Sequence, residues 1–124
     1  MEFAGINGAA MRYELSGAGE RTIVLVHEMG GTLESWDGIA PRFAESRRVL
    51  RYDFRGSGLS QKVRGELSID TMADDIAALL DHTKISGKVA LAGVAVGGAP
   101  PVQSTAYMLQ IGLRTIGTVA IPIP

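Results

Sequence analysis

The chain has 124 residues, enough for one domain with a single hydrophobic core, and 46% of them are hydrophobic. Twelve basic residues against thirteen acidic ones give a formal net charge of −1, which argues against a nucleic-acid partner. The lack of cysteine excludes disulfides, thiolate metal ligands and a cysteine nucleophile within these residues.

The sequence also shows no recognisable targeting signal or membrane span. It begins with no basic segment followed by an apolar stretch, and no apolar run approaches the roughly 18 residues of a membrane span. We therefore expect a cytoplasmic protein that has no membrane partner.

The first predicted elements are strands. Residues 3–15 predict a hairpin, because Asn7-Gly8 supplies the positive backbone angles of a tight turn. Residues 22–27 contain the run Ile-Val-Leu-Val, which is too short for a helix and typical of a strand buried on both faces. We expect this run to be a central strand of a parallel sheet.

The next elements alternate between helix and strand. Thr32 can cap a helix in which apolar residues recur at helical spacing before Pro41 and Phe43: Leu33, Trp36, Ile39 and Ala40. Residues 49–52 predict a strand that ends in Asp53, and a loop follows it.

Ser68 opens a second predicted helix. One face of this helix is apolar, with Ile69, Met72, Ile76, Leu79 and Leu80. The acidic residues lie mostly on the other face: Asp70, Asp74, Asp75 and Asp81. The periodicity is that of a helix packed on one side of a core.

The last predicted elements are a strand over 88–94, a helix from about 102 to 111, and a strand over 115–121 ended by prolines. The alternation of strands and helices predicts a single domain over residues 1–124 of the α/β class. We expect a mostly parallel sheet flanked by helices, and incomplete after its last strand.

Three glycine-containing segments follow successive predicted strands. They are His27-Glu28-Met29-Gly30-Gly31, then residues 53–60 with the pattern Asp-x-Arg-Gly-x-Gly-x-Ser, then Gly93-Val94-Ala95-Val96-Gly97-Gly98. The third has the frame Gly-x-Ser-x-Gly of a nucleophile elbow, with alanine at the position of the serine. Alone, this frame is also typical of a glycine-rich bend that packs a helix on a strand.

In this order the three segments strongly resemble the α/β-hydrolase superfamily, over about residues 6–98. They are most similar to the branch of esterases, enol-lactonases and carbon-carbon hydrolases. The resemblance implies that Ala95 occupies the nucleophile position, and that the backbone N–H groups of Met29 and Val96 form the oxyanion hole. Glu28 departs from the family, which usually has glycine there; its carboxylate would oppose an oxyanion unless it points outward.

Other polar residues receive structural interpretations. We expect Asp53 and Arg55 to hold the loop after their strand through hydrogen bonds, and His27 to order a loop. His82 is expected at the surface near the end of its helix, and Trp36 in the core.

The family places its acid and then its histidine after the nucleophile, but residues 99–124 contain no Asp, Glu or His. We therefore expect a catalytically inactive chain, from a parent that hydrolyses a small ester, lactone or similar carbonyl substrate through a serine or cysteine, without metal or organic cofactor. The alternative is a non-catalytic module of the same fold that binds a ligand or partner. Because residues 115–121 would form an uncovered edge strand, we also expect a homo-oligomer or a complementary chain there.

Overall fold

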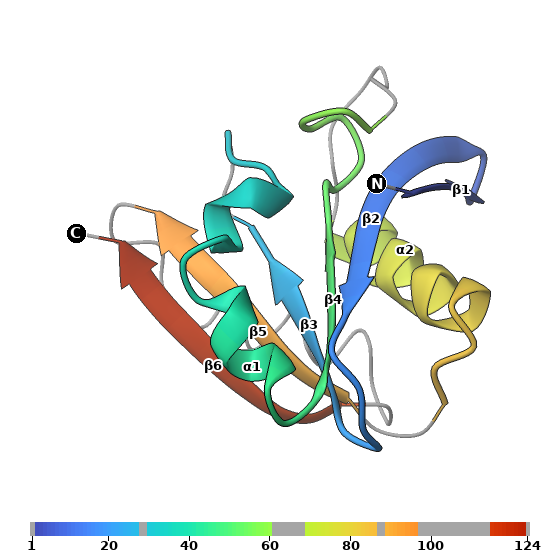
Figure 1. Cartoon of the computed structure of the whole chain (residues 1–124). Coiled ribbons are helices and arrows are strands. Elements are labelled where there is room, and N and C mark those ends of the chain that lie inside the picture. Colours follow the sequence, from blue (N-terminus) through green and yellow to red (C-terminus); the bar gives the residue numbers. More distant parts are fainter. Residues whose placement is uncertain (1, 28–29, 61–68, 87–88, 97–114, 124) are drawn as a thin grey trace.

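The structure is a computed structural model that describes residues 2–27, 30–60, 69–86, 89–96 and 115–123 (Figure 1). These residues form a six-stranded sheet in the order β1-β2-β4-β3-β5-β6. The strands are β1 (Glu2–Ile6), β2 (Ala9–Ser16), β3 (Thr22–Val26), β4 (Arg48–Tyr52), β5 (Val89–Val96) and β6 (Thr115–Ile123). The pairs β1–β2 and β2–β4 are antiparallel, and the other pairs are parallel. The predicted mostly parallel α/β sheet is confirmed.

The predicted N-terminal hairpin is present as β1 and β2. Asn7 and Gly8 form its turn with φ values of 47° and 83°, and Ile6 is paired with Ala9 across it. A two-residue turn with both central residues at positive φ matches the twist of the flanking strands. The pair Asn7-Gly8 therefore fixes the register of the hairpin.

Strand β3 is central, as predicted, because it lies between β4 and β5, and all five of its residues are buried. Alternate side chains point to opposite faces of the sheet. Val24 and Val26 belong to the core under helix α2 (Ile69–His82), whereas Ile23 and Leu25 belong to the core on the other face. Helices thus cover both faces of the parallel part (Figure 1).

The predicted single helix after Thr32 is wrong. The structure has a 3-10 helix η1 (Leu33–Trp36) and a separate helix α1 (Ala40–Ala44), with Pro41 in the first turn of α1. Proline has no N–H to donate to the preceding turn, so it favours the start of a helix over its continuation. The predicted apolar positions are nevertheless used: Leu33, Trp36 and Ala40 are all buried.

Helix α2 confirms the predicted apolar face, since Ile76, Leu79 and Leu80 are fully buried. Ser68, its expected first residue, lies outside the described residues. Asp75 corrects the assignment of the acidic residues to the outer face, because it is only 1% exposed. Its burial is compensated by an ion pair with Arg55, which periodicity cannot reveal.

The C-terminal part of the sheet differs from the prediction in two respects. Strand β5 extends to Val96, so Ala95 lies inside the strand opposite Pro122 of β6, rather than at a sharp turn. Strand β6 also continues through Pro122, which an edge strand tolerates because its outer side needs no ladder hydrogen bonds. The helix expected near residues 102–111 lies outside the described residues.

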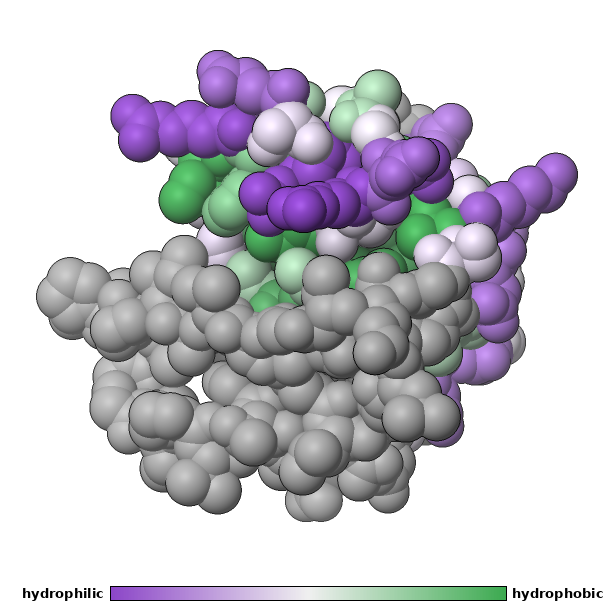
Figure 2. All heavy atoms as spheres, turned by 90° about the horizontal axis from the view of Figure 1, so that it is seen from below, coloured by the Kyte–Doolittle hydropathy of each residue, from purple (hydrophilic) through white to green (hydrophobic). Residues whose placement is uncertain are grey.

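One face of the described part is rich in polar side chains. In the view from below, hydrophilic side chains form much of the coloured surface, and hydrophobic atoms lie between and beneath them (Figure 2). Among the described residues, the exposed large hydrophobic side chains are Phe3 of β1, Leu15 of β2 and Leu59 of the loop after β4. None of the helices among the described residues is long and apolar enough to cross a bilayer.

Candidate functional site

Two buried polar residues lie directly after neighbouring parallel strands. His27 follows β3 and is 3% exposed, and Asp53 follows β4 and is fully buried. The carboxyl ends of parallel strands meet at one edge of a sheet, where α/β proteins place their ligand sites. This edge is therefore the candidate site.

The carboxylate of Asp53 organises the loops around this edge. It accepts hydrogen bonds from Nε of Arg12 at 2.6 Å and Nη2 of Arg12 at 3.0 Å. It also accepts the backbone N–H groups of Leu33 at 2.7 Å and Leu59 at 2.9 Å. One side chain thus joins strand β2, the start of η1 and the loop after β4, which confirms the structural role predicted for Asp53.

Asp53, Arg12 and Glu34 form a cluster of charged side chains in which opposite charges stabilise one another. Burial by itself would raise the pKa of Asp53, but the hydrogen bonds from Arg12 and from the backbone of Leu33 and Leu59 outweigh it, so the pKa lies below its ordinary value. Arg12 also pairs with Glu34, whose side chain is 46% exposed. Asp53 is therefore ionised wherever the fold is intact near neutral pH.

His27 orders a loop, as predicted. Its Nε2 accepts the backbone N–H of Phe54 at 3.1 Å, and its ring stacks on Phe54 with the centroids 4.0 Å apart. An accepting Nε2 carries no proton. Together with the bond from Leu33 to Asp53, this contact attaches His27 and Leu33 to residues 53–54.

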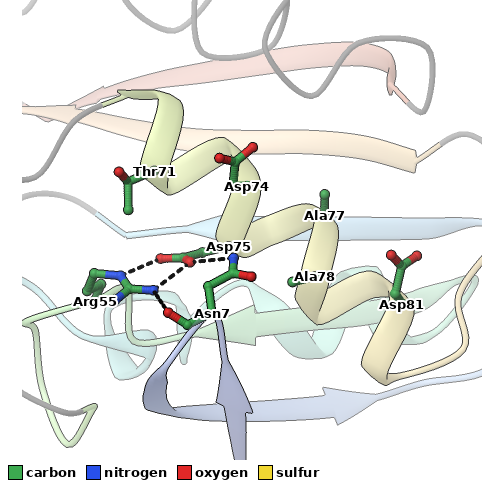
Figure 3. Close-up of a pocket in the computed structure, with 8 residues that line it drawn as sticks. All are labelled: Asn7, Arg55, Thr71, Asp74, Asp75, Ala77, Ala78 and Asp81. Carbon is green, nitrogen blue, oxygen red and sulfur yellow. Dashed lines mark hydrogen bonds and ion pairs between the residues drawn. The ribbon is translucent and has the colours of Figure 1, made fainter.

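Arg55 joins the same loop to helix α2 and to the N-terminal hairpin. Its Nε and Nη2 each donate to one oxygen of Asp75 at 2.9 Å, and Nη2 also donates to the backbone oxygens of Ile6 and Asn7 at 3.2 Å (Figure 3). The structural role predicted for Arg55 is confirmed. A groove beside this ion pair is lined by Asn7 and α2 and includes neither His27 nor Asp53.

Gly58 is required by the close approach of its loop to Asp53. Its φ is 53°, and a Cβ atom built on it would collide with the carboxylate of Asp53. Gly38 offers a matched comparison, because a Cβ atom there meets nothing within 4 Å.

We expect Gly58→Ala to lower the free energy of unfolding by about 1–3 kcal/mol, because the strained backbone and the collision displace the Asp53 carboxylate. Gly38→Ala is expected to change it by no more than about 0.5 kcal/mol. Urea unfolding of both variants measures the difference. Equal effects of the two substitutions would show that the approach of Gly58 to Asp53 does not constrain the loop.

The predicted catalytic positions are placed in part. Gly93 of β5 pairs with Val26 of β3, so Ala95 and Val96 extend β5 past this pair, toward the same edge as His27. Met29 and Glu28 lie outside the described residues. The structure thus brings Ala95, Val96 and the His27–Asp53 loops to one edge, and their predicted catalytic roles stay predictions.

Sequence reasoning missed two members of the cluster. Arg12 was not recognised, although it is only 6% exposed. Ser60 donates its hydroxyl to the backbone oxygen of Asp53 at 2.6 Å and accepts the backbone N–H of Arg12 at 2.8 Å. Ser60 ends the Asp-x-Arg-Gly-x-Gly-x-Ser pattern, so its place in that motif was an available signal. His82 and Trp36 are at the surface and in the core, as predicted.

Comparison with known proteins identifies a family model and several proteins that are similar to this chain. The family model described as the alpha/beta hydrolase fold matches residues 21–103. The chain is 31% identical over 90 residues to 3-oxoadipate enol-lactonase 2 of Acinetobacter baylyi, covering 72% of the chain and 33% of that protein. It is 40% identical over 97 residues to a dihydrolipoyllysine-residue acetyltransferase component of the acetoin cleaving system of Pseudomonas putida, covering 77% of the chain and 26% of that protein.

Several solved structures are also similar to this chain. The enol-lactonase from Burkholderia xenovorans LB400 has a TM-score of 0.72 at 30% identity, over 76% of this chain and 37% of its own. A thermophilic esterase from Thermogutta terrifontis has a TM-score of 0.84 at 27% identity, over 97% of this chain and 45% of its own. The chain therefore spans about a quarter to a half of the length of these relatives.

Proposed function

The chain belongs to the α/β-hydrolase fold family, and from this premise we propose that it carries the N-terminal part of a site that hydrolyses a small ester, lactone or similar carbonyl compound. The observation that carries the proposal is the convergence of three motifs at the carboxyl ends of adjacent strands β4, β3 and β5. The names of the enol-lactonase and esterase relatives support this substrate class.

In this proposal, position 95 is the position of the catalytic nucleophile. In the parent protein, a serine or cysteine there attacks the carbonyl carbon, a later histidine takes its proton, and the N–H groups of Met29 and Val96 bind the oxyanion that forms. Ala95 has no hydroxyl or thiol that could form the covalent bond. We therefore propose that this chain is catalytically inactive as it stands.

We propose that the described contacts on either side of residues 28–29 position the oxyanion hole. His27 accepts the N–H of Phe54 and Leu33 donates to Asp53, and these contacts support the role proposed for the N–H of Met29. A preorganised donor stabilises developing charge without reorganising during the reaction. Asp53 is thus proposed to act through positioning and not through contact with the substrate.

Ala95 also favours a second candidate, a non-catalytic relative that binds a ligand in the pocket of the missing nucleophile. The two candidates differ in one respect that can be measured. The hydrolase scaffold regains turnover when a nucleophile and the rest of the fold are supplied, whereas the binding module does not.

The experiment joins residues 1–98 of this chain to the corresponding remainder of the Acinetobacter enol-lactonase, with Ala95 or Ala95→Ser. Hydrolysis of activated esters and of an enol-lactone is measured for both chimeras, and circular dichroism establishes that both fold. If folded Ala95→Ser and Ala95→Cys chimeras are equally inert, the hydrolase proposal is overturned. Binding of the lactone without turnover by all of them would instead support the second candidate.

The uncovered side of β6 predicts association of the chain. Among the described residues β6 pairs only with β5, and an unpaired strand edge recruits other strands. We propose that the isolated chain forms dimers or larger species through this edge. Sedimentation across a range of concentrations measures it, and Thr118→Lys, which adds a charge to the edge strand, is expected to weaken the association. A stable monomer at high concentration would contradict it.

A further inference from the structure

The turn of the N-terminal hairpin contains the single asparagine of the sequence, Asn7, followed by glycine. Asn7 is exposed, and its φ of 47° is in the left-handed region. Its side-chain amide nitrogen donates to Oδ1 of Asp75 at 3.0 Å, beside the ion pair between Asp75 and Arg55 (Figure 3). The proposed hydrolase site makes no use of this side chain.

We propose that Asn7 is a site of spontaneous deamidation, and that the product detaches the hairpin turn from helix α2. The backbone nitrogen of Gly8 attacks Cγ of Asn7 and forms a five-membered succinimide. The bond from Cγ to Nδ2 breaks, and the nitrogen leaves as ammonia with the proton of the Gly8 amide. Water then adds to one of the two ring carbonyls and opens the ring to aspartate or isoaspartate. The net change is the gain of water and the loss of ammonia.

The turn leaves the backbone nitrogen of Gly8, the nucleophile of this reaction, accessible. A glycine has no Cβ atom to shield its nitrogen, and a Cβ built on Gly8 meets no atom beyond its chain neighbours within 4 Å, so the space beside its Cα is open. Both turn residues are exposed, which gives water access to the ring that forms. Covalent changes at exposed loop positions need no opening of the core.

The product conflicts with Asp75. The amide of Asn7 is a hydrogen-bond donor, whereas an ionised aspartate only accepts, so two carboxylates would face each other at the 3.0 Å contact. Asp75 is 1% exposed, and Arg55 already uses Nε and Nη2 on its two oxygens. Like charges placed together with little solvent destabilise the state that holds them.

Isoaspartate has a further effect, because it adds one carbon to the backbone of the turn. The two-residue turn holds Ile6 opposite Ala9, and a longer turn does not close that register. Arg55 also binds the backbone oxygens of Ile6 and Asn7, so the lengthened turn removes these contacts as well.

Incubation of the folded chain at 37 °C and mildly alkaline pH tests the proposal. We expect the tryptic peptide that ends at Arg12 to gain about 1 Da and to become a substrate for isoaspartyl methyltransferase. Mapping to this peptide is needed because Asp37-Gly38 can also form isoaspartate, without a change of mass. Asn7→Gly keeps a turn with positive φ but cannot deamidate, and it serves as the unreactive control.

The effect of the product is measured on Asn7→Asp. We expect its Tm to lie about 3 °C or more below that of Asn7→Gly, and this difference to shrink when both are combined with Asp75→Asn. If Asn7 stays intact in the folded chain while a free peptide of residues 2–12 deamidates, the turn protects it and the proposal is overturned. Equal Tm values of Asn7→Asp and Asn7→Gly would overturn the proposed detachment.

Discussion

A serine at position 95 of the chimera is expected to raise the rate of ester hydrolysis by roughly 10³- to 10⁶-fold over the same chimera with Ala95. The Ala95 chimera keeps the proposed oxyanion donors, acid and histidine, but it lacks the atom that forms the covalent bond. Initial rates with an activated ester, and the burst that an acyl-enzyme produces, measure the gain. Ala95→Cys is expected to fall between the two.

The same substitution in the chain of residues 1–124 is the matched control. Ala95→Ser there is expected to stay at the background rate, because residues 99–124 supply neither acid nor histidine to activate the hydroxyl. Activity of this variant above the background would show that another group of the chain acts as the base. It would then contradict the assignment of the base to residues outside the chain.

Asp53→Ala is expected to lower the free energy of unfolding by about 3–5 kcal/mol. Among the residues that the structure describes, the substitution leaves the buried guanidinium of Arg12 with only the half-exposed Glu34 as a charged partner, and it removes the acceptor of two backbone N–H groups. An uncompensated buried charge costs far more than the loss of a surface ion pair. Urea unfolding followed by circular dichroism measures it, and Asp53→Asn keeps the test available if the alanine variant does not fold.

Asp37→Ala is the control for a surface pair. Asp37 contacts Arg51 at 2.6 Å but its side chain is 62% exposed, so a change below about 1 kcal/mol is expected.

The pKa of Asp53 adds a second readout, because it is lowered in the fold. Its contribution to stability is present above the ordinary pKa of a carboxyl group and is lost as the pH falls through the folded value. Asp53→Asn should therefore reduce the acid sensitivity of the fold, and an unchanged acid transition would contradict this account.

The fold was largely predictable because its signals are local. The β-branched run of β3 and the turn residues Asn7 and Gly8 each carry their own conformational preference, and both were predicted correctly. The prediction of one helix after Thr32 was wrong, because apolar spacing does not distinguish a single helix from a 3-10 helix followed by a short helix that begins at Ala40. The rotation of α2 was right, but Asp75 was placed outside because periodicity cannot show that Arg55 compensates its burial.

The site was less predictable because its contacts join distant positions. Nothing near Arg12 in the sequence indicates that its partner is Asp53, which reaches it only when β2 pairs with β4. The resemblance assigned Met29 and Val96 to one oxyanion hole, which implies that the ends of β3 and β5 lie together, and the two strands are paired. Strand β5 running through Ala95 was not predicted, since the motif suggested a turn at that residue.

The strand order has a consequence for the order in which the strands pair during folding. The β1–β2 hairpin is the one pairing in the described sheet that needs only a two-residue loop, while the others close much longer loops and pay more entropy before they form. The hairpin can therefore form first and then receive β4 as its next strand. The contact between Arg12 and Asp53 arises only at that docking step, so it links an early local unit to the slower parallel part and favours cooperative assembly of the two.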